Sequence, residues 1–437
     1  MNQDTQQDNK EDQKPLVRML GKNLLQQEQE AAEGKKENAT VRAAVSARLR
    51  ELMQAENFSV LTGAGSSVEV LGSVTFGNNA LQKDGWARKP FARETTHLDE
   101  LIKIYEEGRG SQGLDPEYGV EEFLHFLYQL EYVHPYGLKI NRASGDEIKV
   151  AELRSKILGQ LKSECGCDLT RATEFRNYRN FLKRIISRPT NLRRTNLFTT
   201  NYDLIFERVM DEMGLLYVDG FVGGTRHFFQ PQAFNYDYYY PATTTEGRVS
   251  RLERVLHFYK LHGSLNWAES NDSSPGNVYG VEKKEPVSDH ENLLVYPTPM
   301  KEHETIGFPY CELLRRFAGI IQQPQSVLIT YGYGFGDAHI NRAIYEALNI
   351  PSFQLVIVSY DWTPSLRRIW DHARDLPCVG FVVGKEYAGW QTFANELIPD
   401  LPTIELEERY ETRQVAAKTL RDLSRQSAQQ SGTNNGK

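Results

Sequence analysis

The chain has 437 residues, of which 40% are hydrophobic and 25% are charged, and its formal net charge is −7 at pH 7. This composition supports a folded core and excludes wholesale disorder, while four cysteines are too few for a disulfide-based scaffold. The net negative charge argues against a general nucleic-acid coat, because such binding depends mostly on neutralising phosphates. Apolar runs such as residues 353–358 are far shorter than the ~18 residues of a membrane span, so we expect a cytoplasmic protein.

Residues 1–40 are rich in Gln, Asn, Glu and Lys, and we expect them to form a polar tail. The main domain is expected over residues 41–400, where short β-type runs alternate with helical patterns. Residues 401–437 begin with closely spaced charges and end in Ser, Gln, Asn and Gly. This last segment is therefore predicted to be a charged C-terminal helix and tail.

The main domain is predicted to be α/β, with a Rossmann-like parallel sheet and helices on both faces. Apolar residues four apart predict helices that begin near residues 205 and 340, and Thr363 before Pro364 is a helix-start signal. Between about residues 90 and 190, apolar residues at helical spacing predict a helical insertion over the open end of the sheet. The expected strands are residues 58–61, 197–199, 327–330, 353–358 and 379–383.

A glycine-rich motif directly follows the first expected strand. It runs from Gly63 through Ala64, Gly65 and Ser66 to Ser67. Glycines let the backbone approach a phosphate closely, and exposed N–H groups attract the anion. Val68 stands where the dinucleotide fingerprint has its third glycine, so a simple tight turn explains the motif about equally well.

The second motif, TTNYD at residues 199–203, joins an expected strand to an amphipathic helix. Its polar residues Thr200, Asn201 and Asp203 are candidates for a ligand site, because ligands bind at the carboxyl ends of parallel strands. A structural explanation is also open, since Asp203 is a favourable helix-capping residue and Asn201 suits a turn.

The third motif, KLHGSLNW at residues 260–267, ends another β-type run. Histidine suits general-base chemistry near neutral pH, and the glycine beside His262 leaves room for a substrate. A lone histidine is more often structural, so this motif has little weight by itself.

The fourth motif, YGYGFGDAH at residues 331–339, again joins a strand to a helix. Gly332, Gly334 and Gly336 alternate with aromatic residues, which suits a loop pressed against a planar or phosphorylated ligand. Asp337 is equally a helix N-cap, and a role in loop shape alone is the alternative.

In order and spacing, the four motifs together resemble the sirtuin family. That family carries a GAG-S loop after its first strand, a Thr-Gln-Asn-Ile-Asp motif, a catalytic His-Gly and a glycine-containing loop near the adenosine of NAD. The form YGYGFGDAHI at residues 331–340 is most similar to bacterial sirtuin-like proteins of antiviral defence, in which the domain degrades NAD. The resemblance covers roughly residues 45–385.

The resemblance implies that the chain takes NAD+ as its substrate. Asn201 would hold the nicotinamide ribose and position water, Asp203 would orient the loop or the nicotinamide amide, and His262 would be the general base or a ribose-hydroxyl partner. Ser359 would contact the adenosine ribose. The full set of residues expected to bind NAD+ is Gly63, Ala64, Gly65, Ser66, Thr200, Gly332, Gly334, Asp337 and Ser359.

The chain departs from the deacylases of that family in two places. Their zinc module has two CxxC pairs, whereas the cysteines here are Cys165, Cys167, Cys311 and Cys378, so we expect no zinc module and no metal. Their Gly-Ile-Pro-Asp-Phe-Arg stretch is also missing after the first loop. Both departures weaken the case for acyl-lysine chemistry more than the case for binding NAD.

We therefore expect an NAD+ hydrolase that acts as an antiviral effector by depleting NAD+. The alternatives are an NAD-dependent protein deacylase and a non-catalytic module that senses NAD+ or ADP-ribose. Because loss of NAD+ is toxic, we expect restraint by homo-oligomerisation or by a co-encoded partner such as a HerA-like ATPase or an Argonaute.

A basic stretch supplies a separate expectation about partners. Its seven basic residues are Arg176, Arg179, Lys183, Arg184, Arg188, Arg193 and Arg194, with no acidic residue between them. The first three fall on one stripe of a predicted helix. A solvated helix face explains the stretch, and the sharper hypothesis is a contact for nucleic acid or for an acidic partner.

Overall fold

A computed structural model gives the fold. It describes residues 15–19, 22–23, 34–72, 81–82, 85–91, 96–111, 120–134, 138, 149–165, 175–240, 251–284, 293–295, 309–401 and 419. The chain divides into two units, Met1–Pro399 and Asp400–Lys437, and every element below belongs to the first unit. The predicted C-terminal helix and tail lie outside the described residues except at two positions.

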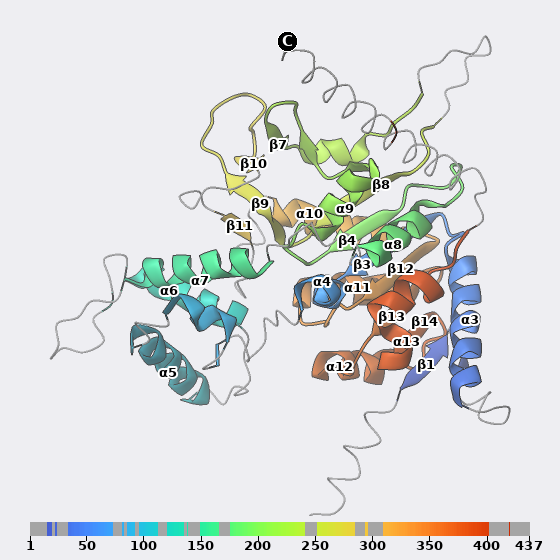
Figure 1. Ribbon diagram of the computed structural model, residues 1–437, viewed down its shortest axis with the longest axis horizontal. Helices are drawn as coiled ribbons and strands as arrows, with labels where there is room; N and C mark the ends of the chain where they lie inside the picture. The colour runs from blue at the N-terminus through green and yellow to red at the C-terminus, as the bar shows by residue number, and fades with distance from the viewer. Residues whose placement is uncertain are drawn as a thin grey trace, which may run out of the picture. The chain divides into compact units, whose positions relative to one another are not determined.

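A nine-stranded sheet forms the centre of the first unit, in the order β2-β1-β14-β13-β12-β3-β4-β8-β5 (Figure 1). The strands from β14 to β5 run parallel to one another, whereas β1 and β2 are antiparallel additions beside β14. The strands in chain order are β1 Leu16–Met19, β2 Lys22–Asn23, β3 Asn57–Thr62, β4 Asn196–Thr199, β5 Leu216–Val218, β8 Val255–Lys260, β12 Ser326–Tyr331, β13 Gln354–Ser359 and β14 Val379–Val383. The predicted parallel sheet is confirmed, including all five expected strands.

The order of the strands reverses between β3 and β12. From β3 the chain adds β4 and β8 on one side, and from β12 it adds β13 and β14 on the other. Right-handed crossovers in opposite directions place the connecting helices on opposite faces of the sheet. The gap between β3 and β12 is therefore a topological switch point, where open α/β sheets bind ligands.

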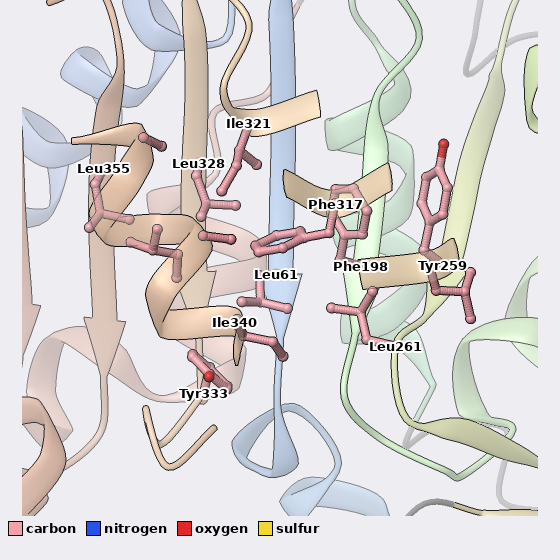
Figure 2. Packing of buried hydrophobic residues seen from close by; sticks show 14 of the residues in the cluster. Leu61, Phe198, Tyr259, Leu261, Phe317, Ile321, Leu328, Tyr333, Ile340 and Leu355 are labelled. Atoms are coloured by element: carbon pink, nitrogen blue, oxygen red, sulfur yellow. The ribbon is translucent and has the colours of Figure 1, made fainter. Parts of the chain in front are cut away.

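Helices cover both faces of the sheet, as predicted. On one face, Leu61, Phe198 and Leu328 from the strands share a buried core with Phe317 and Ile340 from the helices (Figure 2). The helices contributing to this core are α10 Tyr310–Ile321, α11 Ala338–Ala347 and α12 Pro364–Ala373. The helix starting at Pro364 is capped by Thr363, whose hydroxyl accepts from Leu366 N, as the Thr-Pro signal predicts.

The opposite face is rich in aromatic contacts. Phe258 of β8 lies 6.2 Å from the ring of Phe206, and Tyr331 of β12 stacks on Phe393 at 4.3 Å between ring centroids. The helical segments of this layer are α3 Gly34–Leu52, α8 Arg176–Ile186, α9 Ile205–Met213, α13 Lys385–Ala388, α14 Trp390–Thr392 and the π-helical turn η6 Phe393–Leu397.

A helical insertion with its own apolar core lies between β3 and β4 in the chain. Its elements are the 3₁₀ helix η3 Trp86–Phe91 and the helices α5 Thr96–Ser111, α6 Val120–Val133 and α7 Val150–Cys165. Tyr202, Leu204 and Leu265 also belong to this core, and they come from the segments that follow β4 and β8. The insertion therefore packs against the carboxyl end of the sheet.

Helix α8 corrects the predicted extent of this insertion, which ran to about residue 190. Tyr178 and Phe181 of α8 pack on Trp390 of the sheet-covering layer, with ring centroids 4.9 and 5.2 Å apart. The apolar stripe of α8 was correctly recognised, but the sequence alone does not say which core it joins.

The polar tail predicted over residues 1–40 is also corrected. Leu16–Met19 pairs antiparallel with β14, with Val17 and Met19 buried, and α3 already begins at Gly34. The strand has only four residues and is flanked by polar residues in the sequence. Its alternation of buried and half-buried positions is therefore too short to be recognised from the sequence.

A second sheet was not predicted. It is antiparallel, in the order β11-β9-β10-β7-β6, and its strands are β6 Phe221–Val222, β7 His227–Phe229, β9 Gly263–Glu269, β10 Val281–Lys283 and β11 Leu293–Val295. Only Leu261 and His262 separate β8 of the large sheet from β9 of the small one. Gly263 turns the chain there with a φ of 85°, which is accessible to glycine at little cost.

Within the described ranges, no helix combines the length and the apolar character that crossing a membrane requires.

Candidate functional site

All four motifs follow strands that run in the same direction. The strands β3, β4, β8 and β12 are neighbours and parallel, so the loops after Thr62, Thr199, Lys260 and Tyr331 emerge at one edge of the sheet. The first and last of these loops lie on either side of the switch point. The fold thus brings together the segments that the sequence singles out.

The glycines on the two sides of the switch point touch one another. A Cβ on Gly63 would lie 2.6 Å from the carbonyl oxygen of Gly332, and one on Gly65 would lie 2.7 Å from the Gly332 Cα. Gly332 itself has a φ of 58°, in the region that favours glycine. These three glycines are therefore required by the close approach of two backbones, whatever else they do.

The N–H groups of the first loop are mostly occupied within the protein. Gly63 N donates to Tyr331 O at 3.0 Å and Gly65 N to Gly332 O at 3.1 Å. Ser66 N and Ser67 N donate to the carbonyls of the 3₁₀ turn η1 Ala64–Ser66 and the residue before it. The structure thus favours a tight, internally bonded turn over the open row of N–H groups that a phosphate cradle requires.

Asn201 ties the loop after β4 to the loop after β3. Its Nδ2 lies 3.0 Å from Gly63 O, 3.1 Å from Ser66 Oγ and 2.7 Å from Ser67 Oγ, and the residue is buried. The neighbouring Thr200 N donates to Thr62 O at 3.0 Å, which extends the pairing of the two strands beyond their ends. Asn201 is therefore a fixed group that spans two loops.

Asp203 completes this network through Ser67. Ser67 Oγ donates to Asp203 Oδ2 at 2.6 Å, while Asp203 Oδ1 accepts from Ile205 N at 3.0 Å at the start of α9. Asp203 thus contacts both the first loop and the backbone at the start of α9, whose N-cap residue is Leu204 rather than the predicted Asp203. Ser67 was quoted in the motif but not chosen as a site residue, and nothing in the sequence shows that its hydroxyl joins Asn201 to Asp203.

His262 pairs with Asp337, from the fourth motif. Nε2 of His262 lies 3.0 Å from Asp337 Oδ2, and 14% of the histidine side chain is exposed. An ionised carboxylate only accepts, so Nε2 carries the proton in this contact. The other carboxylate oxygen caps α11 by accepting from His339 N and Ile340 N at 2.9 and 3.2 Å. The predicted N-cap is confirmed, and the pairing with His262 was not foreseen.

The aromatic residues of the fourth motif anchor its loop. Tyr333 and Phe335 are buried in the core of Figure 2, with ring centroids 4.7 Å apart, and burial raises the pKa of the Tyr333 hydroxyl well above its usual value. Tyr333 OH donates to Asn341 Oδ1 at 3.1 Å. These two rings therefore face the core.

Gly334 differs from Gly332 in its surroundings. A Cβ on Gly334 would meet nothing within 4 Å, so packing does not require a glycine there. Ser359 ends the neighbouring strand β13, and its hydroxyl donates to Asp361 O at 2.7 Å. Both residues thus lie at the carboxyl edge of the sheet, beside the switch point.

One buried lysine in this region escaped the choice of candidate residues. Nζ of Lys260 donates to the carbonyl oxygens of Tyr202 and Asp203 and to Glu207 Oε1. A signal was present, because a charged residue interrupts the apolar run that ends β8. Its partners lie more than 50 residues earlier in the chain and cannot be read from that run.

Most of the basic stretch at residues 176–194 is used inside the fold. Arg179 pairs with Glu212, Arg194 with Asp237, and Arg184 donates to the carbonyl oxygens of Asn395 and Ile398. Arg188 is buried against backbone carbonyls of residues 53 and 55, and burial lowers its pKa to about 10. These arginines are therefore used within the fold, rather than forming the solvated face that was the simpler prediction.

The described part of the chain contains no cluster of three or more His, Cys, Asp or Glu side chains arranged to hold a metal ion. Cys165, Cys311 and Cys378 are free thiols, and Cys167 lies outside the described residues.

Residues 195–368 match the family model of the SIR2-like domain. The matched segment contains the second, third and fourth motifs, and it leaves out the GAGSS loop, which the fold nevertheless places beside them. No curated protein matches the chain.

Two solved structures show a distant likeness. One, of Sir2 with a p53 peptide and NAD+, is 12% identical in sequence and has a TM-score of 0.38, with 80% of this chain and 96% of that chain covered. The other, a Sir2 homologue in complex with NAD, is 13% identical and has a TM-score of 0.36, with 80% and 91% covered. Neither likeness is close enough to assign an activity.

Proposed function

We propose that the protein hydrolyses NAD+ to nicotinamide and ADP-ribose and serves as an antiviral effector by depleting NAD+. The observation that carries the proposal is the pairing of His262 with Asp337 at the same sheet edge as the Asn201–Ser67–Asp203 network. These groups come from four loops, and two of those loops flank the switch point of a parallel sheet. The SIR2-like match over residues 195–368 supports NAD+ as the ligand.

The reaction requires little acid catalysis. Water attacks C1′ of the nicotinamide ribose, the bond from C1′ to the pyridinium nitrogen breaks, and that electron pair neutralises the positive charge of the leaving nicotinamide. One proton is lost from the water. The protein must therefore hold the ribose, position the water and accept the proton.

The contacts described above suit these tasks. The amide nitrogen of Asn201 is bonded to the first loop, which directs its carbonyl oxygen to a ribose hydroxyl or to water. His262 is the proton acceptor, and Asp337 holds the ring through Nε2 and stabilises the imidazolium that forms. Asp203 and Ser67 keep Asn201 in place and need not touch the substrate.

The test is NAD+ consumption by the purified full-length chain, with nicotinamide and ADP-ribose quantified and no acylated peptide present. His262→Ala is expected to lower turnover about 10²–10⁴-fold, the usual contribution of a positioned general base. Asn201→Ala is expected to lower it comparably while leaving the protein folded. His372→Ala is the matched control, since this histidine is exposed on α12 and contacts only its own helix among the described residues.

The outcomes separate the competing functions. NAD+ consumption that starts only when an acylated peptide is added would identify a deacylase. Saturable binding of NAD+ without nicotinamide release would identify a sensing module. Near-normal turnover in His262→Ala would show that His262 is not the general base. Restraint by a homo-oligomer, a HerA-like ATPase or another co-encoded partner stays a prediction, tested by repeating the assay with that partner.

A further inference from the structure

A buried ammonium group connects the two halves of the candidate site. Lys260 is the last residue of β8 and is 3% exposed. Its Nζ lies 3.1 Å from Tyr202 O and 2.8 Å from Glu207 Oε1, and it also donates to Asp203 O. A lysine ammonium has three hydrogens, and here each has an acceptor.

Burying the Lys260 and Glu207 side chains costs free energy, and a purely structural role does not explain that cost. Burial raises the pKa of the Glu207 carboxyl, although the nearby Lys260 ammonium acts in the opposite direction. Glu207 Oε2 finds no hydrogen-bond partner among the described residues. A buried ion pair of this kind is often no more stabilising than two well-packed apolar side chains, so its presence needs another reason.

The groups that Lys260 binds suggest a reason for burying it. The carbonyls of Tyr202 and Asp203 belong to the loop that carries Asn201, and Lys260 itself precedes His262 by two residues. Thr199 and Lys260 are partners at the ends of β4 and β8. Beyond them the chains separate, one entering α9 and the other entering β9, and the ammonium bonds the two segments across this divergence.

We propose that Lys260 is a positioning residue, which fixes the backbone that carries Asn201 relative to the backbone that carries His262. The proposal rests on the hydrolase function proposed above. Lys260 acts only through the main chain and does not touch the substrate. A displacement of about 1 Å between reacting groups can cost roughly 100-fold in rate, so loss of this bridge is expected to lower kcat by that amount and to leave KM little changed.

Two variants separate positioning from stability. Lys260→Met leaves the Glu207 carboxyl buried without its partner, so the melting temperature is expected to fall together with kcat. Lys260→Met combined with Glu207→Leu replaces the pair by apolar side chains, which is expected to restore the melting temperature. If Lys260 positions the loops, the double variant stays about 100-fold slow, because the Asp203 carbonyl has lost its lysine donor and the Tyr202 carbonyl keeps only the bond from Leu265 N. Recovery of kcat with stability would overturn the proposal.

Lys283→Met is the matched control. Lys283 is also a half-buried lysine with a carboxylate partner, Asp219, at 2.8 Å, but it lies on β10 of the small sheet. The charge of Lys283 also lies near Glu207, but among the described residues Lys283 donates its hydrogen bond to Asp219 and not to the loop after β4 or β8. Its replacement is therefore expected to lower the melting temperature and to leave kcat within about 2-fold of the wild type.

Backbone hydrogen exchange tests the positioning role of Lys260 independently of NAD+ hydrolysis. In the double variant, amides of residues 202–208 are expected to exchange at least about 10-fold faster than in the wild type, and in Lys283→Met at an unchanged rate. If the wild type consumed no NAD+, the hydrolase proposal would fail while faster exchange would still show the bridge. Unchanged exchange in the double variant would overturn the positioning role in either case.

Discussion

His257 and His262 lie five residues apart on β8 and the turn after it, and both are half-buried, but their partners differ. His257 lies inside the strand, where burial lowers its pKa to about 4, and its Nε2 has no hydrogen-bond partner among the described residues. His262 lies where the chain leaves the sheet, paired with the carboxylate of a distant loop. A histidine whose pKa is lowered to about 4 stays neutral and does not exchange protons near neutral pH.

The charged groups near these histidines differ in the same way. Around His257, Arg194 and Arg251 both bind Asp237, at 2.8 and 2.6 Å, and tie together segments remote from the site edge. Around His262, Asp337 divides its oxygens between the histidine and the helix start. The contacts around His257 are expected to determine stability, and those around His262 are expected to determine turnover. Each prediction below tests this difference.

The largest expected effect is that of Asp337→Asn on turnover. Asparagine is as good a helix cap as aspartate, so the free energy of unfolding is expected to change by less than about 0.5 kcal/mol. The imidazolium of His262 loses its counter-charge, and kcat is expected to fall about 10²–10⁴-fold. Steady-state assays and urea titrations measure the two quantities. If Asp337→Asn were stable and kept the wild-type kcat, Asp337 would act only as a helix cap, and its contact with His262 would not contribute to turnover.

Arg194→Met is expected to have the opposite signature. The Arg194 side chain is 7% exposed, and its loss removes one of the two arginine partners of the half-buried Asp237 carboxylate, so the free energy of unfolding should fall by about 1.5–3 kcal/mol. Turnover per folded molecule should not change, because the hydrogen bonds of the Arg194 side chain among the described residues go to Asp237 and not to the site loops. Urea unfolding at pH 7 measures the first, and a drop in kcat without a loss of stability would contradict this difference.

The third prediction concerns pH. His257 has a folded-state pKa of about 4, below its ordinary value, so the unfolded chain binds more protons between about pH 6.5 and 4. Its contribution to stability is complete above that window and is lost as the pH falls through it, by about 3 kcal/mol. In His257→Asn this part of the pH dependence is expected to disappear. Equal slopes of unfolding free energy against pH in both proteins would show that His257 is not buried as described.

The sequence predicts the large sheet because its strands are long, apolar and buried on both faces. Val327 to Thr330 and Phe353 to Val358 could be recognised without any partner. The small sheet could not, since β6, β7 and β10 have only two or three residues each and offer no period to read. Leu16–Met19 fails for the same reason, and only its pairing with β14 makes it a strand.

In the candidate site, residue types were predictable and pairings were not. Asn201, Asp203, His262 and Asp337 each stand out as polar residues in the segments that follow buried strands, two to six residues past the strand end. The contact between His262 and Asp337 joins positions 75 residues apart, and that between Lys260 and Glu207 joins positions 53 apart. Such contacts depend on which strands are neighbours, and a single sequence does not carry that information.

The contact among Gly63, Gly65 and Gly332 has a mechanical consequence. Side chains can accommodate a small shift by changing rotamer, but glycines have no side chains to do so. The two main chains are in direct contact here, and the contact leaves no room for a shift of either loop. The loops after β3 and β12 must then move together or not at all. A single methyl group placed at Gly65 acts as a wedge between them, and Asn201, bonded to the first of these loops, moves with it.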